Sequence, residues 1–341
     1  HWMVRQLLVP GSEISYYWRV QTASGNHWTT EPQQVNYDDT RFNWRQARDG
    51  FITLYSYGSG EAASQGLLQE ARDVLDLMER EYGLILKKEV KVFVYADEQD
   101  YLTAFGPLQV SSTAVTVGTD RIFMLLAVLP EDSIAAIRHE VLHAVFLQRT
   151  ENAFNDPPRW LTEGFSMFLS GEEIPPENID ILRQLDSEGQ LFSLRSLNGG
   201  FPSTDRERAI AYLESYSALR YIIEEFGTQK LKALLAAISE GNATDDAFVQ
   251  ALGVTVGELD QRWRESLQRG DQASPSTAPR VGQATDDAAE GWLARTMGFW
   301  NENLGVLGRP ILIGLVVAAL IITILGFRSG RRRRKSGEND D

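Results

Sequence analysis

Three residues within one short stretch could do metal chemistry: His139, Glu140 and His143 form the pattern H-E-x-x-H. The chain has only four histidines, so this pair is half of them. On a helix the residues at i and i+4 lie on one face, where two imidazoles can share a single Zn²⁺. Glu140 can then act as general base on a water bound to the metal. Apolar residues around the motif recur with helical spacing, which predicts such a helix. They are Ile134, Ile137, Val141, Leu142, Val145 and Phe146.

A zinc ion in a hydrolase is held by three protein ligands and keeps one position for water. No histidine follows His143 in the sequence, so we expect the third ligand to be a carboxylate. Glu163 stands twenty residues further on, in the run W-L-T-E-G-F. A polar loop, Thr150 to Pro158, predicts a break between two helices, the second of which begins near Arg159. We therefore expect the second helix to bring Glu163 to the two histidines.

H-E-x-x-H followed about twenty residues later by a W-x-x-E-G helix resembles the gluzincins. These are the thermolysin-like branch of the zincin metallopeptidases, and the match is best to the bacterial peptidase MA-like domains. The resemblance covers roughly residues 50–269. It implies an α+β zincin-like fold, in which a mixed sheet with an antiparallel edge strand and active-site helices precedes a helical subdomain. It also implies that His139, His143 and Glu163 bind zinc and that Glu140 is the catalytic base.

The chain departs from thermolysin in its means of stabilising the oxyanion. Thermolysin uses a downstream histidine, and none follows His143 here. Another donor is then needed, and Tyr212 and Tyr216 are candidates on a helix expected at Arg206–Gly227. The alternative is that these tyrosines only pack that helix against the core. The G-x-M-E-N signature of the gluzincin aminopeptidases is also missing, which favours an endopeptidase.

A β-α-β pattern precedes the motif, and further helices follow it. Strands are expected at Phe51–Tyr57, Val90–Tyr95, Ala114–Val117 and Arg121–Val128, and a helix at Glu61–Tyr82 ended by Gly83. By resemblance, Arg121–Leu126 is the edge strand that pairs with an extended substrate. An ordinary core strand fits that sequence equally well. The stretch Gly171–Asp205 is expected to form the far wall of the cleft. The remaining helices are expected at Leu231–Ser239, Ala247–Leu252 and Val256–Leu267.

Residues 1–48 read as a partial β segment. Strands at Ile14–Val20, His27–Thr30 and Val35–Tyr37, with a turn at 24–26, resemble the last hairpin of a fibronectin- or immunoglobulin-like sandwich. The strands are too few for a complete sandwich, so we expect a fragment or processed form that lacks an upstream half. His27 is expected to be a surface residue of the hairpin.

Composition limits the classes of function. The chain has no cysteine, which excludes disulfides and thiolate chemistry. Its net charge is −14, yet seven basic and three acidic residues lie from Arg309 onward, so the remainder carries about −18. An acidic body argues against nucleic acid as a partner, because nucleic-acid binding needs a basic face. The 43% hydrophobic content suffices for a substantial core.

The C-terminal region predicts a membrane anchor after the peptidase domain, residues 49–269. Residues 270–303 read as a flexible juxtamembrane linker and residues 304–327 as a transmembrane helix. The seventeen residues Ile311–Phe327 carry no charge and would span about 26 Å as a helix. Residues 328–341 form a basic tail, which places the C terminus in the cytoplasm and the catalytic domain outside.

The sequence thus predicts a single-pass zinc peptidase of a bacterial cell membrane, with its catalytic domain outside the cytoplasm. Its expected substrates are peptides or proteins, among them those of the cell surface. Two alternatives stay open. One is a cell-surface binding or scaffold protein with a structural or vestigial zinc. The other is a zinc amide hydrolase that acts on cell-wall peptides. Glu140 argues against the first alternative, because a structural zinc needs no general base.

Overall fold

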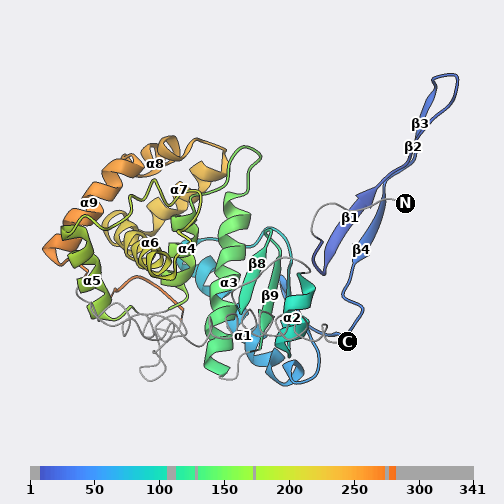
Figure 1. The fold of residues 1–341 in the computed structure, drawn as a ribbon, viewed down its shortest axis with the longest axis horizontal. Helices are drawn as coiled ribbons and strands as arrows, with labels where there is room; N and C mark the ends of the chain where they lie inside the picture. Colours follow the sequence, from blue (N-terminus) through green and yellow to red (C-terminus); the bar gives the residue numbers. More distant parts are fainter. Residues whose placement is uncertain (1–7, 106–112, 127–129, 172–173, 273–275, 282–341) are drawn as a thin grey trace, which may run out of the picture.

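The body of the protein has two parts that meet along one long helix, α3 (Pro130–Thr150). Figure 1 shows a mixed sheet with its helices on one side of α3 and a bundle of helices on the other. This computed structural model describes residues 8–105, 113–126, 130–171, 174–272 and 276–281. Because α3 contacts the sheet as well as α4 and α7, a side chain on it can meet groups from both parts.

The sheet has five strands in the order β5-β6-β7-β9-β8 within the described residues. They are β5 (Arg45–Asp49), β6 (Ile52–Ser56), β7 (Val90–Tyr95), β9 (Arg121–Leu125) and β8 (Ala114–Val117). The three central strands are parallel, and each outer strand is antiparallel to its neighbour. Tight turns make the two hairpins, and Gly118, with φ +67°, supplies the left-handed residue that the β8–β9 turn needs.

The expectation that Arg121–Leu126 is the edge strand is wrong. Strand β9 lies between β7 and β8, and the edge strand is β8. The physical reason is that β9 pairs with β7 in parallel, and the short turn at Gly118 folds β8 onto the remaining side of β9. Ile122, Phe123 and Met124 are all fully buried, as is typical of a strand covered on both faces.

The two faces of the sheet have different covers, as the two-residue period of a strand requires. Val92 and Val94 of β7 pack in the core formed with α3 and with α1 (Gly60–Leu77). Their neighbours Phe93 and Tyr95 point to the opposite face, into an aromatic cluster beside α2 (Glu98–Ala104). Helix α1 continues as the π-helical turn η1 (Met78–Tyr82) and ends at Gly83, as expected.

The second part is helical. It consists of α4 (Arg159–Leu169), α5 (Pro176–Ser187), α6 (Asp205–Phe226), α7 (Thr228–Ser239), α8 (Thr244–Leu252) and α9 (Val256–Arg269). The expected helices agree with these bounds to within about three residues, whereas β5, α2 and α5 were not predicted. Two of the three had signals: Asp97 caps α2 by accepting hydrogen bonds from two N–H groups, and Pro176 opens α5.

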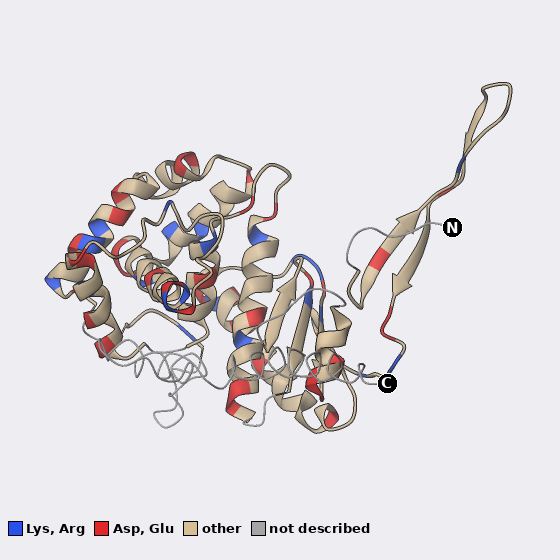
Figure 2. Cartoon of the chain, in the orientation of Figure 1, with Lys and Arg blue, Asp and Glu red and all other residues tan. Residues whose placement is uncertain are grey.

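The N-terminal segment forms a β-ribbon that extends away from the body (Figure 1). Strand β1 (Ser12–Tyr16) pairs with β4 (Gln33–Tyr37), and β2 (Arg19–Gln21) pairs with β3 (His27–Thr29). Large side chains are exposed on it, and Figure 2 shows few charged residues there. Of the expected partial sandwich, the described residues contain this ribbon alone. His27 is exposed on it, as expected.

The expectation of a flexible linker from residue 270 is wrong for residues 276–281. Arg280 and Val281 are buried: Arg280 donates a hydrogen bond to the Tyr216 hydroxyl (3.3 Å), and the Val281 amide donates one to the Leu169 carbonyl (3.1 Å). The Pro279 carbonyl accepts a hydrogen bond from Tyr82 at 2.6 Å. These contacts use the backbone and one long side chain, so apolar periodicity could not reveal them.

The other C-terminal predictions lie outside the described residues. They concern the rest of the linker to residue 303, the membrane helix 304–327 and the tail 328–341. Among the helices that the structure describes, none combines the length and the apolar character needed to cross a bilayer.

Among the described residues of the helical part, Glu214 is a buried carboxyl group with no ion pair. Glu214 on α6 has no exposed surface, and its Oε1 accepts a hydrogen bond from the Phe192 amide at 2.9 Å. Burial raises the pKa of Glu214 to about 8. The side chain is therefore largely protonated in the folded protein at neutral pH.

Replacing Glu214 by Gln should make the folded protein less sensitive to alkaline pH. Because the folded pKa is the higher one, the stabilisation from the bound proton is complete below about pH 4.5 and is lost as the pH rises through about 8. At about pH 9 the Glu214→Gln variant should exceed the wild type in unfolding free energy by about 1 kcal/mol or more. Urea unfolding across this range measures the difference, with the exposed Glu188→Gln as control. Identical pH profiles for the Glu214→Gln variant and the wild type would contradict the prediction.

Candidate metal centre

Helix α3 presents the two histidines of the H-E-x-x-H motif toward α4. One side of α3 packs on the sheet and α1 through residues such as Ile137, Val141 and Val145, which leaves the next face of the helix for the imidazoles. His139 and His143 are buried, and their Nε2 atoms lie 3.0 Å apart. The one-turn spacing therefore brings two nitrogen donors together, as the sequence predicts.

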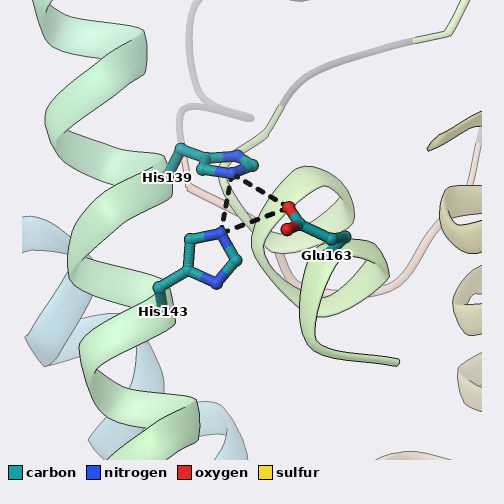
Figure 3. Close-up of side chains that lie close together, drawn as sticks. All are labelled: His139, His143 and Glu163. Carbon is teal, nitrogen blue, oxygen red and sulfur yellow. Dashed lines mark hydrogen bonds and ion pairs between the residues drawn. The ribbon is translucent and has the colours of Figure 1, made fainter. Parts of the chain in front are cut away.

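Glu163 on α4 completes a triangle with these nitrogens (Figure 3). Its Oε2 lies 3.3 Å from Nε2 of His143 and 3.7 Å from Nε2 of His139. A tetrahedral zinc ion with bonds of about 2.0–2.1 Å holds its ligand atoms about 3.3–3.4 Å from one another. The three donors are spaced to within a few tenths of an ångström of that value, and two imidazoles with one carboxylate are a donor set that zinc prefers.

The electrostatics of the site favour a cation among these donors. Burial alone would raise the pKa of Glu163, but His143 and His139 lower it well below its ordinary value. Burial would lower the pKa of His143, and the Glu163 carboxylate raises it instead. A buried anion thus favours the protonated form of the His143 imidazole. A metal ion bound there would take the place of that proton.

A second cation lies on the other oxygen of Glu163. The guanidinium of Arg159 is 2.9 Å from Oε1, and it also stands over the ring of Phe201 at 5.6 Å. Arg159 is half exposed, whereas Glu163 is buried, so the arginine closes the solvent side of the carboxylate. The pair fixes which oxygen of Glu163 faces the histidines.

The position of α4 depends on the absence of a side chain at Gly164. A Cβ atom there would lie 2.3 Å from the carbonyl oxygen of Ser215 on α6, far inside contact distance. The two helices can approach this closely only with glycine at that position. Because Gly164 follows Glu163 directly, the same contact sets the distance of the carboxylate from α3.

The proposed base, Glu140, is also buried. Its Oε2 accepts a hydrogen bond from the hydroxyl of Thr116 at 2.6 Å, and its backbone carbonyl lies 3.1 Å from the same hydroxyl. Thr116 belongs to the edge strand β8. The structure therefore places a group from the sheet against the carboxylate of the H-E-x-x-H motif.

The two candidate oxyanion donors differ in their surroundings. Tyr212 packs edge-on to Phe201 at 4.9 Å and lies close to the ion pair of α4. Burial raises the pKa of Tyr212, the charge of Glu163 adds to this, and Arg159 opposes it. Tyr216 packs instead against Phe168 at 5.3 Å and accepts a hydrogen bond from Arg280. The structure thus brings Tyr212 close to Glu163 and Arg159.

Two residues of the site were not among the sequence-based candidates. Arg159 had a usable signal, since it stands four residues before Glu163 on the same helix, a spacing at which opposite charges pair. Thr116 had none, because its contact with Glu140 joins a strand to a helix across 24 residues of sequence.

A helix-borne H-E-x-x-H motif beside a second helix with a buried glutamate, next to a mixed sheet, defines a domain of the metallopeptidase class. The chain belongs to the Peptidase MA superfamily, whose family model matches residues 70–269. No curated protein matches the chain significantly.

Sixty-five chains of solved structures are similar to this one at a significant level. Among them is an M1 zinc metallopeptidase from Deinococcus radiodurans, solved as a mutant bound to a Tyr-Ser-Ala substrate. The two share 15% identity with a TM-score of 0.35. The match covers 80% of this chain and 64% of the other.

Substituting Gly164 by Ala should push α4 away from α6 and displace Glu163. We expect zinc affinity to fall by roughly tenfold or more, together with the melting temperature. Competition with a chromogenic chelator and calorimetry measure the two effects. Gly66→Ala is the matched control, because a Cβ atom at that site in α1 meets open space and alanine favours a helix. Wild-type zinc affinity in the Gly164→Ala variant would contradict the account.

Proposed function

We propose that the protein is a zinc-dependent peptidase whose ion is bound by His139, His143 and Glu163. The observation that carries this proposal is the triangle of donor atoms, with separations of 3.0, 3.3 and 3.7 Å, on the helix that also bears Glu140. Membership of the Peptidase MA superfamily supports the same assignment.

A zinc ion in this site would supply a Lewis acid for the substrate carbonyl and a water activated for attack. The residues of the chain would do the rest. Glu140 takes a proton from the attacking water and returns it to the nitrogen of the leaving amine. Tyr212 would donate a hydrogen bond to the oxygen that becomes negative, and its closeness to Glu163 supports this role. Arg159 neutralises the second oxygen of Glu163 and holds that ligand in place.

Two other functions would use the same scaffold. One is a binding protein with a structural or vestigial zinc, which a fourth protein ligand would favour. In the described part of the chain the cluster consists of three donors, so this alternative lacks that support. A zinc amide hydrolase of cell-wall peptides would use the same chemistry on another substrate. The internal cleavage of peptides is proposed on the sequence alone, because the aminopeptidase signature is missing.

We also propose that the C-terminal region anchors the peptidase to a bacterial membrane, with the domain outside. The support is the uncharged run Ile311–Phe327 followed by the basic residues Arg331–Lys335. Substrates on the same cell surface would then be the nearest ones.

The variant Glu140→Gln should separate metal binding from catalysis. It should retain one zinc per chain and the wild-type melting temperature, while kcat for peptide hydrolysis falls by several orders of magnitude. Metal analysis, calorimetry and a peptide library read by mass spectrometry give the three quantities. Full activity in the zinc-loaded variant would contradict the proposed mechanism. A zinc-loaded wild type that cleaves no peptide of the library would favour the scaffold alternative.

A cysteine introduced at Ser336 should test the topology, because the chain has no native thiol. In intact cells Ser336→Cys should stay unlabelled by a membrane-impermeant maleimide and become labelled after lysis. The reason is that five adjacent cations resist translocation. Ser24→Cys on the exposed ribbon is the matched control, and it should be labelled in intact cells. The opposite pattern would place the peptidase domain in the cytoplasm.

A further inference from the structure

The hydroxyl of Thr116 is directed at the carboxylate of Glu140. It lies 2.6 Å from Oε2 and 3.1 Å from the backbone carbonyl of the same residue. A threonine hydroxyl has one proton to donate. The shorter contact, to Oε2, has the length of a good O–H···O hydrogen bond, so this proton is donated to the carboxylate.

The placement of Thr116 follows from the alternation of strand β8. Val115 and Val117 face the aromatic cluster, so Ala114 and Thr116 face α1 and α3 on the other side. On that face Thr116 pairs in register with Ile122 of β9, a fully buried residue. Valine, which has the shape of threonine, would suit such an apolar surface. The hydroxyl is thus the feature of Thr116 that packing does not require.

Glu140 also needs the hydrogen bond from Thr116. Glu140 is only 7% exposed, and a buried carboxylate without donors is costly. A general base must keep one oxygen free for the proton that it accepts, so a donor on the second oxygen fixes the carboxylate without blocking it. Threonine suits this task because its branched Cβ restricts the side-chain rotamer.

We propose that Thr116 is a positioning residue, which holds Oε2 of Glu140 so that the other oxygen faces the reacting water. This inference rests on the proposed peptidase function and deepens it. In addition to any pairing with a substrate backbone, the edge strand would then orient the general base. The candidate metal ligands come from α3 and α4, and the orientation of the base comes from the sheet.

Two substitutions in the full-length, zinc-loaded protein test the proposal. Thr116→Val removes the hydroxyl and keeps the shape, whereas Thr116→Ser keeps the hydroxyl. Thr116→Val should lower kcat roughly tenfold to hundredfold with KM within about twofold and one zinc per chain. Thr116→Ser should restore kcat to within about threefold of the wild type. Thr113→Val, at an exposed position before β8, is the control and should leave kcat unchanged.

Crystal structures of the same variants give a readout that does not need activity. The Glu140 carboxylate should keep its position in Thr116→Ser and leave it in Thr116→Val. A carboxylate that stays in place in Thr116→Val, a wild-type kcat in that variant, or an equal loss in both variants would overturn the proposal. If the wild type cleaves no peptide, the proposed function fails, and the position of Glu140 in the two crystal structures still decides the role of Thr116.

Discussion

The rest of the site depends on one constraint: Glu163 is an anion buried between two helices. A buried carboxylate is costly unless it is paired, and here His143 of α3 lies 3.3 Å from one oxygen and Arg159 lies 2.9 Å from the other. The crossing of α3 and α4 is set by this requirement, and the close approach of α4 to α6 at Gly164 holds the crossing in place. A divalent cation bound by His139, His143 and Glu163 would also pair this carboxylate, so the arrangement suits a metal centre.

The chemistry of the site was accessible from the sequence because most of it is local. The one-turn spacing of His139 and His143 and the apolar period around them define a helix face without any knowledge of the fold. Glu163 was accessible through its own helix and the absence of later histidines. Arg159 could have been found by its four-residue spacing from Glu163. Thr116 could not, because no local pattern links a strand residue to a helix residue that it meets only after folding.

The fold, like the site, was predictable from the sequence where its signals are local. Strand β7 and helix α1 with its Gly83 end were expected at nearly the observed bounds, since periodicity and a left-handed glycine are local signals. The assignment of Arg121–Leu126 to the edge of the sheet was wrong and the alternative of a core strand was right, because pairing partners depend on crossovers and turns rather than on the strand's own residues. The packed segment 276–281 was misjudged for a related reason: its hydrogen bonds come from backbone groups and Arg280, and its two buried apolar side chains, Ala278 and Val281, are too few to form a periodic pattern.

Zinc X-ray absorption on the metal-loaded full-length protein tests the central claim most directly. The account predicts a first shell of nitrogen and oxygen atoms at about 2.0–2.1 Å with the multiple scattering of two imidazoles. Substituting Glu163 by Ala should change that shell and leave both imidazoles in it. A spectrum with one imidazole or none in the wild type, or one that Glu163→Ala leaves unchanged, would contradict the assignment of His139, His143 and Glu163 as the metal ligands.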